Sequence, residues 1–280
     1  MIRSFFSKKL SLNVWNAAKV VPVVRNLWVV SDLHITHDED STAQSFVELV
    51  DLQVMAGDRL VLAGDLFDVF LGEKQIFIDR FQLVISCLKR AAARGVFIDF
   101  IEGNHDLQLA KVVELIPNSR LREPGVALSL SGVNCWIEHG DLANSSDWGY
   151  LLLRAALRSA ALRLLVEVVP APLVDRISRT ASETSRNHHP MLPESLPASE
   201  LSNLRKIYRT AANQILLSGA DRVIFGHCHD RDEVIFRMGE RQVQYINMGF
   251  PPVHGTVLHW AQGDDRIRRV PFRYQAAHSG

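Results

Sequence analysis

The sequence predicts an α/β fold in which two β-sheets pack face to face, with helices outside and a helical insertion. Strand-like apolar runs alternate with helical segments in the first part of the chain, and short strands separated by turns follow residue 222. Between these parts, a long segment shows helical spacing without strand-like runs. We therefore expect an N-terminal extension at 1–26, a core at 27–147 and 219–275, and a helical lid at 148–218.

The first part of the chain predicts parallel strands joined by helices. Helical apolar spacing occurs at 41–55 and 74–94, and buried strands are expected at 27–31, 59–63 and 96–101. Strands that alternate with helices favour right-handed crossovers and a parallel sheet.

The last part of the chain predicts shorter strands. Turn signals such as Met238-Gly239-Glu240 separate them. The expected strands are 222–225, 232–238, 241–247, 255–260 and 266–272. A strand-rich second half that packs on a parallel first half gives two facing sheets.

The insertion begins with a very apolar segment at 150–169. Its charges lie on opposite helical faces, with Arg154 and Arg158 on one and Arg163 and Glu167 on the other, so it is not a one-sided helix. A second helix is expected at 199–218, with Ser199 as its N-cap.

Composition excludes several classes of protein. The 280 residues contain 47% hydrophobic side chains, enough for a sizeable core, and 31 basic residues balance 31 acidic ones. No overall field therefore favours nucleic acid, and no nucleic-acid partner is expected. Three scattered cysteines favour a reducing compartment, and neither a secretory signal nor a membrane span is evident. We expect a cytoplasmic protein with no obligate protein partner.

Five short blocks, each after a strand-like run, contain side chains of the types that bind metals. They are Asp32-Leu33-His34, Gly64-Asp65-Leu66-Phe67-Asp68, Gly103-Asn104-His105-Asp106, His139-Gly140-Asp141 and Gly226-His227-Cys228-His229. Because strand side chains alternate, we expect the two residues of each i, i+2 pair to point into one cavity. An ordinary turn or strand end explains any one block alone. All five in succession predict a two-metal hydrolytic site.

The chemistry of these side chains favours particular cations. A mixed nitrogen and oxygen set without thiolate suits Mn, Fe, Zn or Co better than Ca or Mg. One carboxylate, Asp65, can bridge two cations about 3.5–4 Å apart. His105 lies beside a ligand and can stabilise charge on a phosphate, and we expect Asp106 to orient its ring.

In this order, the blocks resemble those of the calcineurin-like metallophosphoesterase superfamily, over about residues 27–260. The resemblance implies an αββα sandwich and two divalent metal ions, most often Mn²⁺. It also implies the ligand sets: Asp32, His34, Asp65 and His229 for the first ion, and Asp65, Asn104, His139 and His227 for the second. His105 matches the catalytic histidine of the superfamily. Cys228 replaces the usual threonine, and its thiol adds a possible sensitivity to oxidation.

The position of the lid resembles the UDP-2,3-diacylglucosamine hydrolase family of lipid A biosynthesis, which releases lipid X and UMP. The resemblance implies that Asn104, His105, Asp147 and His227 contact the substrate. Asp147 matches a substrate-binding aspartate eight residues past His139. For the lid contacts of that family we expect Arg186 or Asn187. The best-studied branch has arginine where this chain has His105.

Two alternatives remain open. The first is a generic metallophosphoesterase, a phosphodiesterase or phosphatase that acts on another nucleotide or small phosphoester. The second is a non-catalytic lipid-binding or scaffold protein on the same fold. In the extension, Phe5, Phe6 and Trp15 lie among basic residues. They suit peripheral contact with the inner membrane's cytoplasmic face, and an extension packed on the core explains them equally well.

Overall fold

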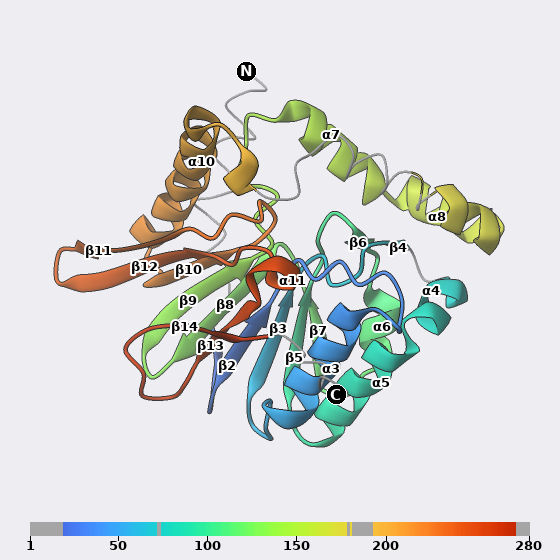
Figure 1. The fold of residues 1–280 in the computed structure, drawn as a ribbon, viewed down its shortest axis with the longest axis horizontal. Coiled ribbons are helices and arrows are strands. Elements are labelled where there is room, and N and C mark those ends of the chain that lie inside the picture. The colour runs from blue at the N-terminus through green and yellow to red at the C-terminus, as the bar shows by residue number, and fades with distance from the viewer. Residues whose placement is uncertain (1–18, 72–73, 178–179, 181–192, 273–280) are drawn as a thin grey trace, which may run out of the picture.

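The computed structural model describes residues 19–71, 74–177, 180 and 193–272. Two six-stranded sheets face each other across a shared apolar cluster, and helices lie outside them (Figure 1). The predicted α/β fold with two sheets is confirmed. Among the described residues, no helix is long and apolar enough to cross a membrane.

The first sheet contains the parallel strands of the first part of the chain. Its order is β14-β13-β2-β3-β5-β7, with neighbours parallel from β2 to β7 and antiparallel at β13 and β14. The bounds are Arg268–Pro271 for β14, Thr256–Trp260 for β13, Leu27–Val30 for β2, Arg59–Ala63 for β3, Phe97–Ile101 for β5 and Ser119–Arg122 for β7. All of the predicted strands in it are present to within two residues.

The second sheet has the order β1-β8-β9-β10-β12-β11. The bounds are Val21–Pro22 for β1, Gly125–Leu130 for β8, Val133–Glu138 for β9, Arg222–Phe225 for β10, Arg241–Asn247 for β12 and Glu233–Met238 for β11. The expectation that each half of the chain forms its own sheet was wrong. β8 and β9 join the strands of the last part, whereas β13 and β14 complete the first sheet. Local periodicity cannot reveal which distant strands pair.

Three apolar clusters hold these layers together. The cluster between the sheets combines side chains from both, including Val29 and Val61 from one and Ile137, Ile224 and Ile246 from the other. A second cluster packs helices α3 (Ser41–Leu52) and α5 (Gln82–Ala93) on the first sheet. A third packs α10 (Ala198–Leu217) on the second sheet. The site-bearing strands are therefore packed on both faces.

Several predicted helices divide or shift. The helix expected at 74–94 consists of α4 (Gln75–Arg80) and α5, separated at Phe81, whose fully buried ring packs 4.3 Å from that of Phe67. Short elements complete the core: β4 (Phe70–Leu71), β6 (Asp106–Leu107), α6 (Ala110–Glu114) and α11 (Pro251–His254).

The apolar segment of the insertion also divides, into α7 (Trp148–Leu157) and α8 (Ala160–Val168). The break follows from Ser159, whose side chain caps α8 by accepting a hydrogen bond from Leu162 N. The predicted N-cap Ser199 was wrong, because α10 begins at Ala198 and Pro197 occupies the cap position. A 3₁₀ turn, η1 (Pro193–Ser195), precedes α10.

Candidate metal centre

All five blocks lie at one edge of the molecule, just beyond the carboxyl ends of β2, β3, β5, β9 and β10. There the structure brings the seven predicted ligands together in neighbouring groups, and a third group of His34, Asp65 and His105 links them. Asp32, His34 and His229 form one group, and Asp65, His139 and His227 form another. Asn104 joins the second group through a 3.1 Å approach of its Oδ1 to His139 Nε2.

The backbone at these residues is unusual. Asp32, His34, Asp65, His227 and His229 all have positive φ, between 47° and 67°. Only three other non-glycine residues in the described chain do so. Left-handed backbone is costly for such residues and concentrates at functional sites. The expectation that strand alternation aligns each pair was therefore wrong: β2 and β10 end before these residues, and left-handed loops aim the side chains.

Two glycines allow the loops to approach closely. A Cβ on Gly103 would lie 1.9 Å from Asp65 Oδ1, and one on Gly226 would lie 2.3 Å from Asp32 Oδ2. Real Cβ atoms do not make such contacts, so only glycine permits the present arrangement. The glycines in the blocks thus shape the site as well as the turns.

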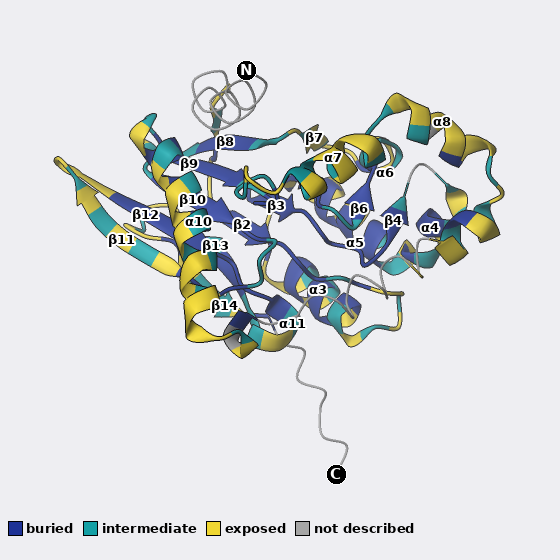
Figure 2. Ribbon diagram, turned by 90° about the horizontal axis from the view of Figure 1, so that it is seen from above, coloured by how far each residue is buried: buried dark blue, intermediate teal, exposed yellow. Residues whose placement is uncertain are grey.

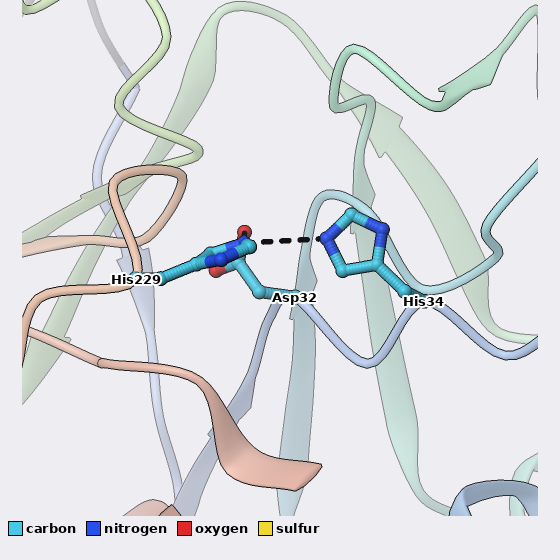
Figure 3. A group of neighbouring side chains, drawn as sticks. All are labelled: Asp32, His34 and His229. Carbon is cyan, nitrogen blue, oxygen red and sulfur yellow. Dashed lines mark hydrogen bonds and ion pairs between the residues drawn. The ribbon is translucent and has the colours of Figure 1, made fainter. Parts of the chain in front are cut away.

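The first half-site combines Asp32, His34 and His229, which point toward one another from two different loops (Figure 3). The Nε2 atoms of His34 and His229 are 3.3 Å apart, and His229 Nε2 lies 3.6 Å from Asp32 Oδ1. Ser31 Oγ and His227 N donate hydrogen bonds to the Asp32 carboxylate and fix its orientation. The phenyl ring of Phe250 stacks on the His229 ring with centroids 4.6 Å apart.

The second half-site centres on His139, which is almost completely buried. Its Nε2 lies 3.1 Å from His227 Nδ1 and 3.5 Å from Asp65 Oδ2. Its Nδ1 lies 3.0 Å from Ala63 O, and because a carbonyl only accepts, Nδ1 carries the proton and donates. Nε2 therefore faces the other ligand atoms, and once it loses its proton its lone pair has the orientation that a metal-bound histidine needs.

The imidazole nitrogens are spaced as a divalent cation requires. Bonds of about 2.1 Å that meet at 90–109° place neighbouring ligand atoms about 3.0–3.4 Å apart. The separations between the imidazole nitrogens, 3.1 and 3.3 Å, fall in this range. Oδ1 of Asn104 lies 3.1 Å from Nε2 of His139, within the same range. The residues present therefore fit the implied metal ions.

Burial and mutual charge control the protonation of the site. Burial lowers the pKa of His34 to about 3 and that of His227 to about 4, so both are neutral near pH 7. For His139, burial opposes the charge, but the carboxylates of Asp65 and Asp32 outweigh it and raise its pKa to about 9. For Asp65, the neighbouring histidines outweigh burial and lower its pKa. The site thus carries concentrated negative charge from ionised carboxylates.

His105 and Asp106 do not interact as expected. His105 Nδ1 donates to the backbone carbonyl of Asp68 at 2.8 Å, so Asp68 orients the ring. The fully buried carboxylate of Asp106 instead accepts from the backbone N–H groups of Asp65, Leu66 and Gly103. Asp106 therefore holds two loops together, and the expectation that it orients His105 was wrong. The catalytic role of His105 stays a prediction.

The predicted substrate contacts have different outcomes. Asp147 is exposed and caps α7 by accepting from Tyr150 N at 2.9 Å; its role toward a substrate stays a prediction. Arg186 and Asn187 lie outside the described residues.

Cys228 accepts a hydrogen bond from Asn247 Nδ2 at 3.0 Å, and burial raises the pKa of its thiol well above the usual range. Its sensitivity to oxidation should therefore be low, because the thiolate is the reactive form.

Sequence reasoning missed a set of contacts between the insertion and the site. Asp141 accepts hydrogen bonds from Tyr150 Oη and Arg154 Nε, both from α7, and Glu102 pairs with Arg158 at the end of that helix. Asp141 and Glu102 adjoin the blocks, and the spacing of four residues between the three α7 side chains was a readable signal.

The strand ends of two facing sheets gather carboxylates and imidazoles into adjoining groups, an arrangement that suits a hydrolase. Curated relatives named UDP-2,3-diacylglucosamine hydrolase resemble it over most of its length. The relative from Xanthomonas campestris pv. campestris (strain B100) is 24% identical and covers 82% of this chain and 92% of its own. That from Nitrosococcus oceani is 26% identical over 71% of this chain and 77% of its own. These names confirm the predicted resemblance and the hydrolase class.

Other comparisons add little. A relative of the same name from Blochmanniella pennsylvanica (strain BPEN) is 25% identical over 87% of this chain and 95% of its own. No family model matches the chain. A crystal structure from Streptococcus pneumoniae TIGR4, described as a conserved uncharacterized protein and predicted phosphoesterase, covers 90% of this chain and 94% of its own. It is 13% identical with a TM-score of 0.37, which is too low to support an argument.

Proposed function

We propose that the protein hydrolyses the pyrophosphate of UDP-2,3-diacylglucosamine to lipid X and UMP, a step of lipid A biosynthesis, with two divalent metal ions, most suitably Mn²⁺. The names of the relatives at about 25% identity support the substrate. The mixed imidazole and carboxylate groups support the cations.

The position of Asp65 is the observation that carries this proposal. Its Oδ2 lies 3.7 Å from His34 Nε2 in one half-site and 3.5 Å from His139 Nε2 in the other. Its Oδ1 accepts a hydrogen bond from His105 N at 2.9 Å, which fixes the carboxylate plane. One oxygen atom is thus shared by both half-sites, as expected for a bridging carboxylate.

The residues of the site then have separate tasks. When bound, the two cations would lower the pKa of a water molecule and neutralise charge on the phosphoryl oxygens. Asp65 would contribute a carboxylate to both half-sites and Asp32 to the first, and Asn104 would contribute a neutral oxygen. His105, with Nδ1 committed to Asp68 O, keeps Nε2 for a phosphate oxygen or for the leaving group. Asp147, at the start of α7, is in our proposal a contact for the substrate.

The exposed apolar surface of the insertion supports a lipid substrate. Figure 2 shows much of α7 and α8 as exposed, and Figure 1 shows both helices beyond the carboxyl ends of the strands. Among the described residues from 148 to 177, the exposed large apolar side chains are Leu152, Leu153, Leu164, Leu165, Val168, Leu173 and Ile177. Exposed apolar groups in this number mark a surface that binds apolar partners. We infer that this surface accepts the acyl chains and contacts the membrane that holds them.

Replacing Asp65 with asparagine tests the proposal. The amide would keep the shape of the side chain but lose the negative charge shared by both half-sites, so hydrolysis in Mn²⁺ buffer should fall by at least about 10³-fold. The matched control is Asp79→Asn, which makes the same change on the exposed face of α4 and should retain full activity. Near-normal turnover by Asp65→Asn would contradict the proposal, provided that circular dichroism shows an intact fold.

Two further outcomes separate the alternatives. Hydrolysis of bis-p-nitrophenyl phosphate without release of UMP from the lipid nucleotide would favour a generic phosphoesterase. A purified protein that binds no divalent cation at any accessible concentration would favour a scaffold or lipid-binding role.

A further inference from the structure

Helix α7 presents polar side chains to the protein and leucines to the solvent. Tyr150, Arg154 and Arg158 follow one another at intervals of four residues and therefore share one face. All three contact the core, whereas Leu152 and Leu153 are 68% and 56% exposed. A helix on a globular protein normally buries its apolar face. The contacts of the polar face must therefore explain how α7 is held.

Two of these side chains converge on Asp141. Tyr150 Oη donates to Asp141 Oδ2 at 2.8 Å, and Arg154 Nε donates to the same oxygen at 2.5 Å. The Asp141 side chain is 4% exposed and lies two residues beyond His139. A buried carboxylate with a charged donor is strongly oriented. Arg154 thus fixes the loop that carries His139.

The third side chain binds the neighbouring loop. Arg158 NH2 donates to the backbone carbonyls of Gly103 at 2.8 Å and Glu102 at 3.2 Å, and NH1 lies 3.3 Å from the Glu102 carboxylate. Its side chain is only 12% exposed. Asn104 is the next residue along the chain. Arg158 thus fixes the loop that carries Asn104.

We propose that Arg154 and Arg158 are positioning residues that couple the insertion to the second half-site, formed by Asp65, Asn104, His139 and His227. The inference rests on the proposed cation site. Residues that orient metal ligands typically change metal affinity by about 10–100-fold when they are replaced. Because coupling is reciprocal, a cation that orders the two loops must also stabilise α7 in its docked position.

The test uses the full chain without metal, titrated with Co²⁺ by calorimetry and visible absorption. Arg158→Met keeps the apolar stem and removes every donor. It should weaken the binding of one of two cation equivalents at least about tenfold and change the Co²⁺ spectrum. The matched control, Arg80→Met, removes a partly buried pair between α4 and Asp175 of the insertion, away from the ligand loops. It should bind both equivalents as the unaltered protein does.

Hydrogen exchange provides a second readout, and its first comparison, with and without cation, uses only the unaltered protein. Addition of Co²⁺ should slow exchange of the amides of 148–157, and this protection should be smaller in Arg158→Met and Arg154→Met. Equal protection of α7 with and without cation, or identical Co²⁺ binding by Arg158→Met, would overturn the inference. If the unaltered protein binds no cation, the proposed function fails instead, so the two failures are distinguishable.

Discussion

Replacing Gly103 with alanine should damage the site through a single added carbon atom. That Cβ would lie 1.9 Å from Asp65 Oδ1 and 2.5 Å from Asp65 N. To restore even a tight contact of about 3.0 Å, the two loops must separate by about 1.1 Å, since 3.0 − 1.9 = 1.1. A displacement of about 1 Å at a reacting centre costs about 10²-fold in rate. Overpacking should also lower the unfolding free energy by about 1–3 kcal/mol.

The assay is cation-supported hydrolysis at saturating Mn²⁺, combined with urea unfolding of the same samples. Gly132→Ala is the control for a glycine replaced without a steric clash, because its Cβ would meet nothing within 4 Å. Its φ of +82° strains alanine, whereas Gly103 has no positive φ, so the cost at Gly132 comes from the backbone alone. We expect Gly132→Ala to lose about 1 kcal/mol of stability with unchanged turnover. If Gly103→Ala behaves like Gly132→Ala in both measurements, the reasoning about the close approach is refuted.

Three more predictions concern the protonation of His139, the thiol of Cys228 and an ion pair of helix α10. At pH 7, cation binding should release at least about one proton, because His139 with a pKa of about 9 must lose it while His34 and His227 are already neutral. Calorimetry in buffers of different ionisation enthalpy measures this proton release. Above pH 9 His139 is already neutral and should release no proton, whereas the absence of release at pH 7 would contradict the assignment. Iodoacetamide should leave activity unchanged, because burial raises the pKa of the Cys228 thiol, and rapid inactivation that Cys228→Ser prevents would disprove this. Arg209→Ala should lower the unfolding free energy by about 2 kcal/mol, because it leaves the buried Asp232 without its bidentate partner. The control is Arg268→Ala, which removes an exposed ion pair. Equal losses of stability in the two variants would argue against the prediction.

The ligand residues could be predicted from the sequence because they occur in short contiguous blocks of metal-binding residue types. Asp32, His34, Asp65, His139 and His229 are of types that seldom gather at strand ends by chance. The reason offered for their alignment was nevertheless wrong. Side-chain alternation is a property of strands, whereas these loops adopt positive φ, which no residue type other than glycine signals clearly.

Contacts made through the backbone were also beyond prediction. The neighbours of Asp106 in sequence suggested that it orients His105, but its partners are three N–H groups, one in its own loop and two in the loop of Asp65. The pairing of β9 with β10 likewise depends on which strands meet in space. By contrast, the spacing of Tyr150, Arg154 and Arg158 was visible in the sequence, and only the direction of that face was not.

Release of UMP from UDP-2,3-diacylglucosamine, followed by mass spectrometry, tests the proposed function most directly. The protein freed of metal should release no UMP, and addition of Mn²⁺ should restore release, with lipid X as the second product. Activity on bis-p-nitrophenyl phosphate should serve as the parallel measure of the metal centre. Hydrolysis of that ester without UMP release from the lipid nucleotide, or UMP release that persists in metal-free protein, would contradict the proposal.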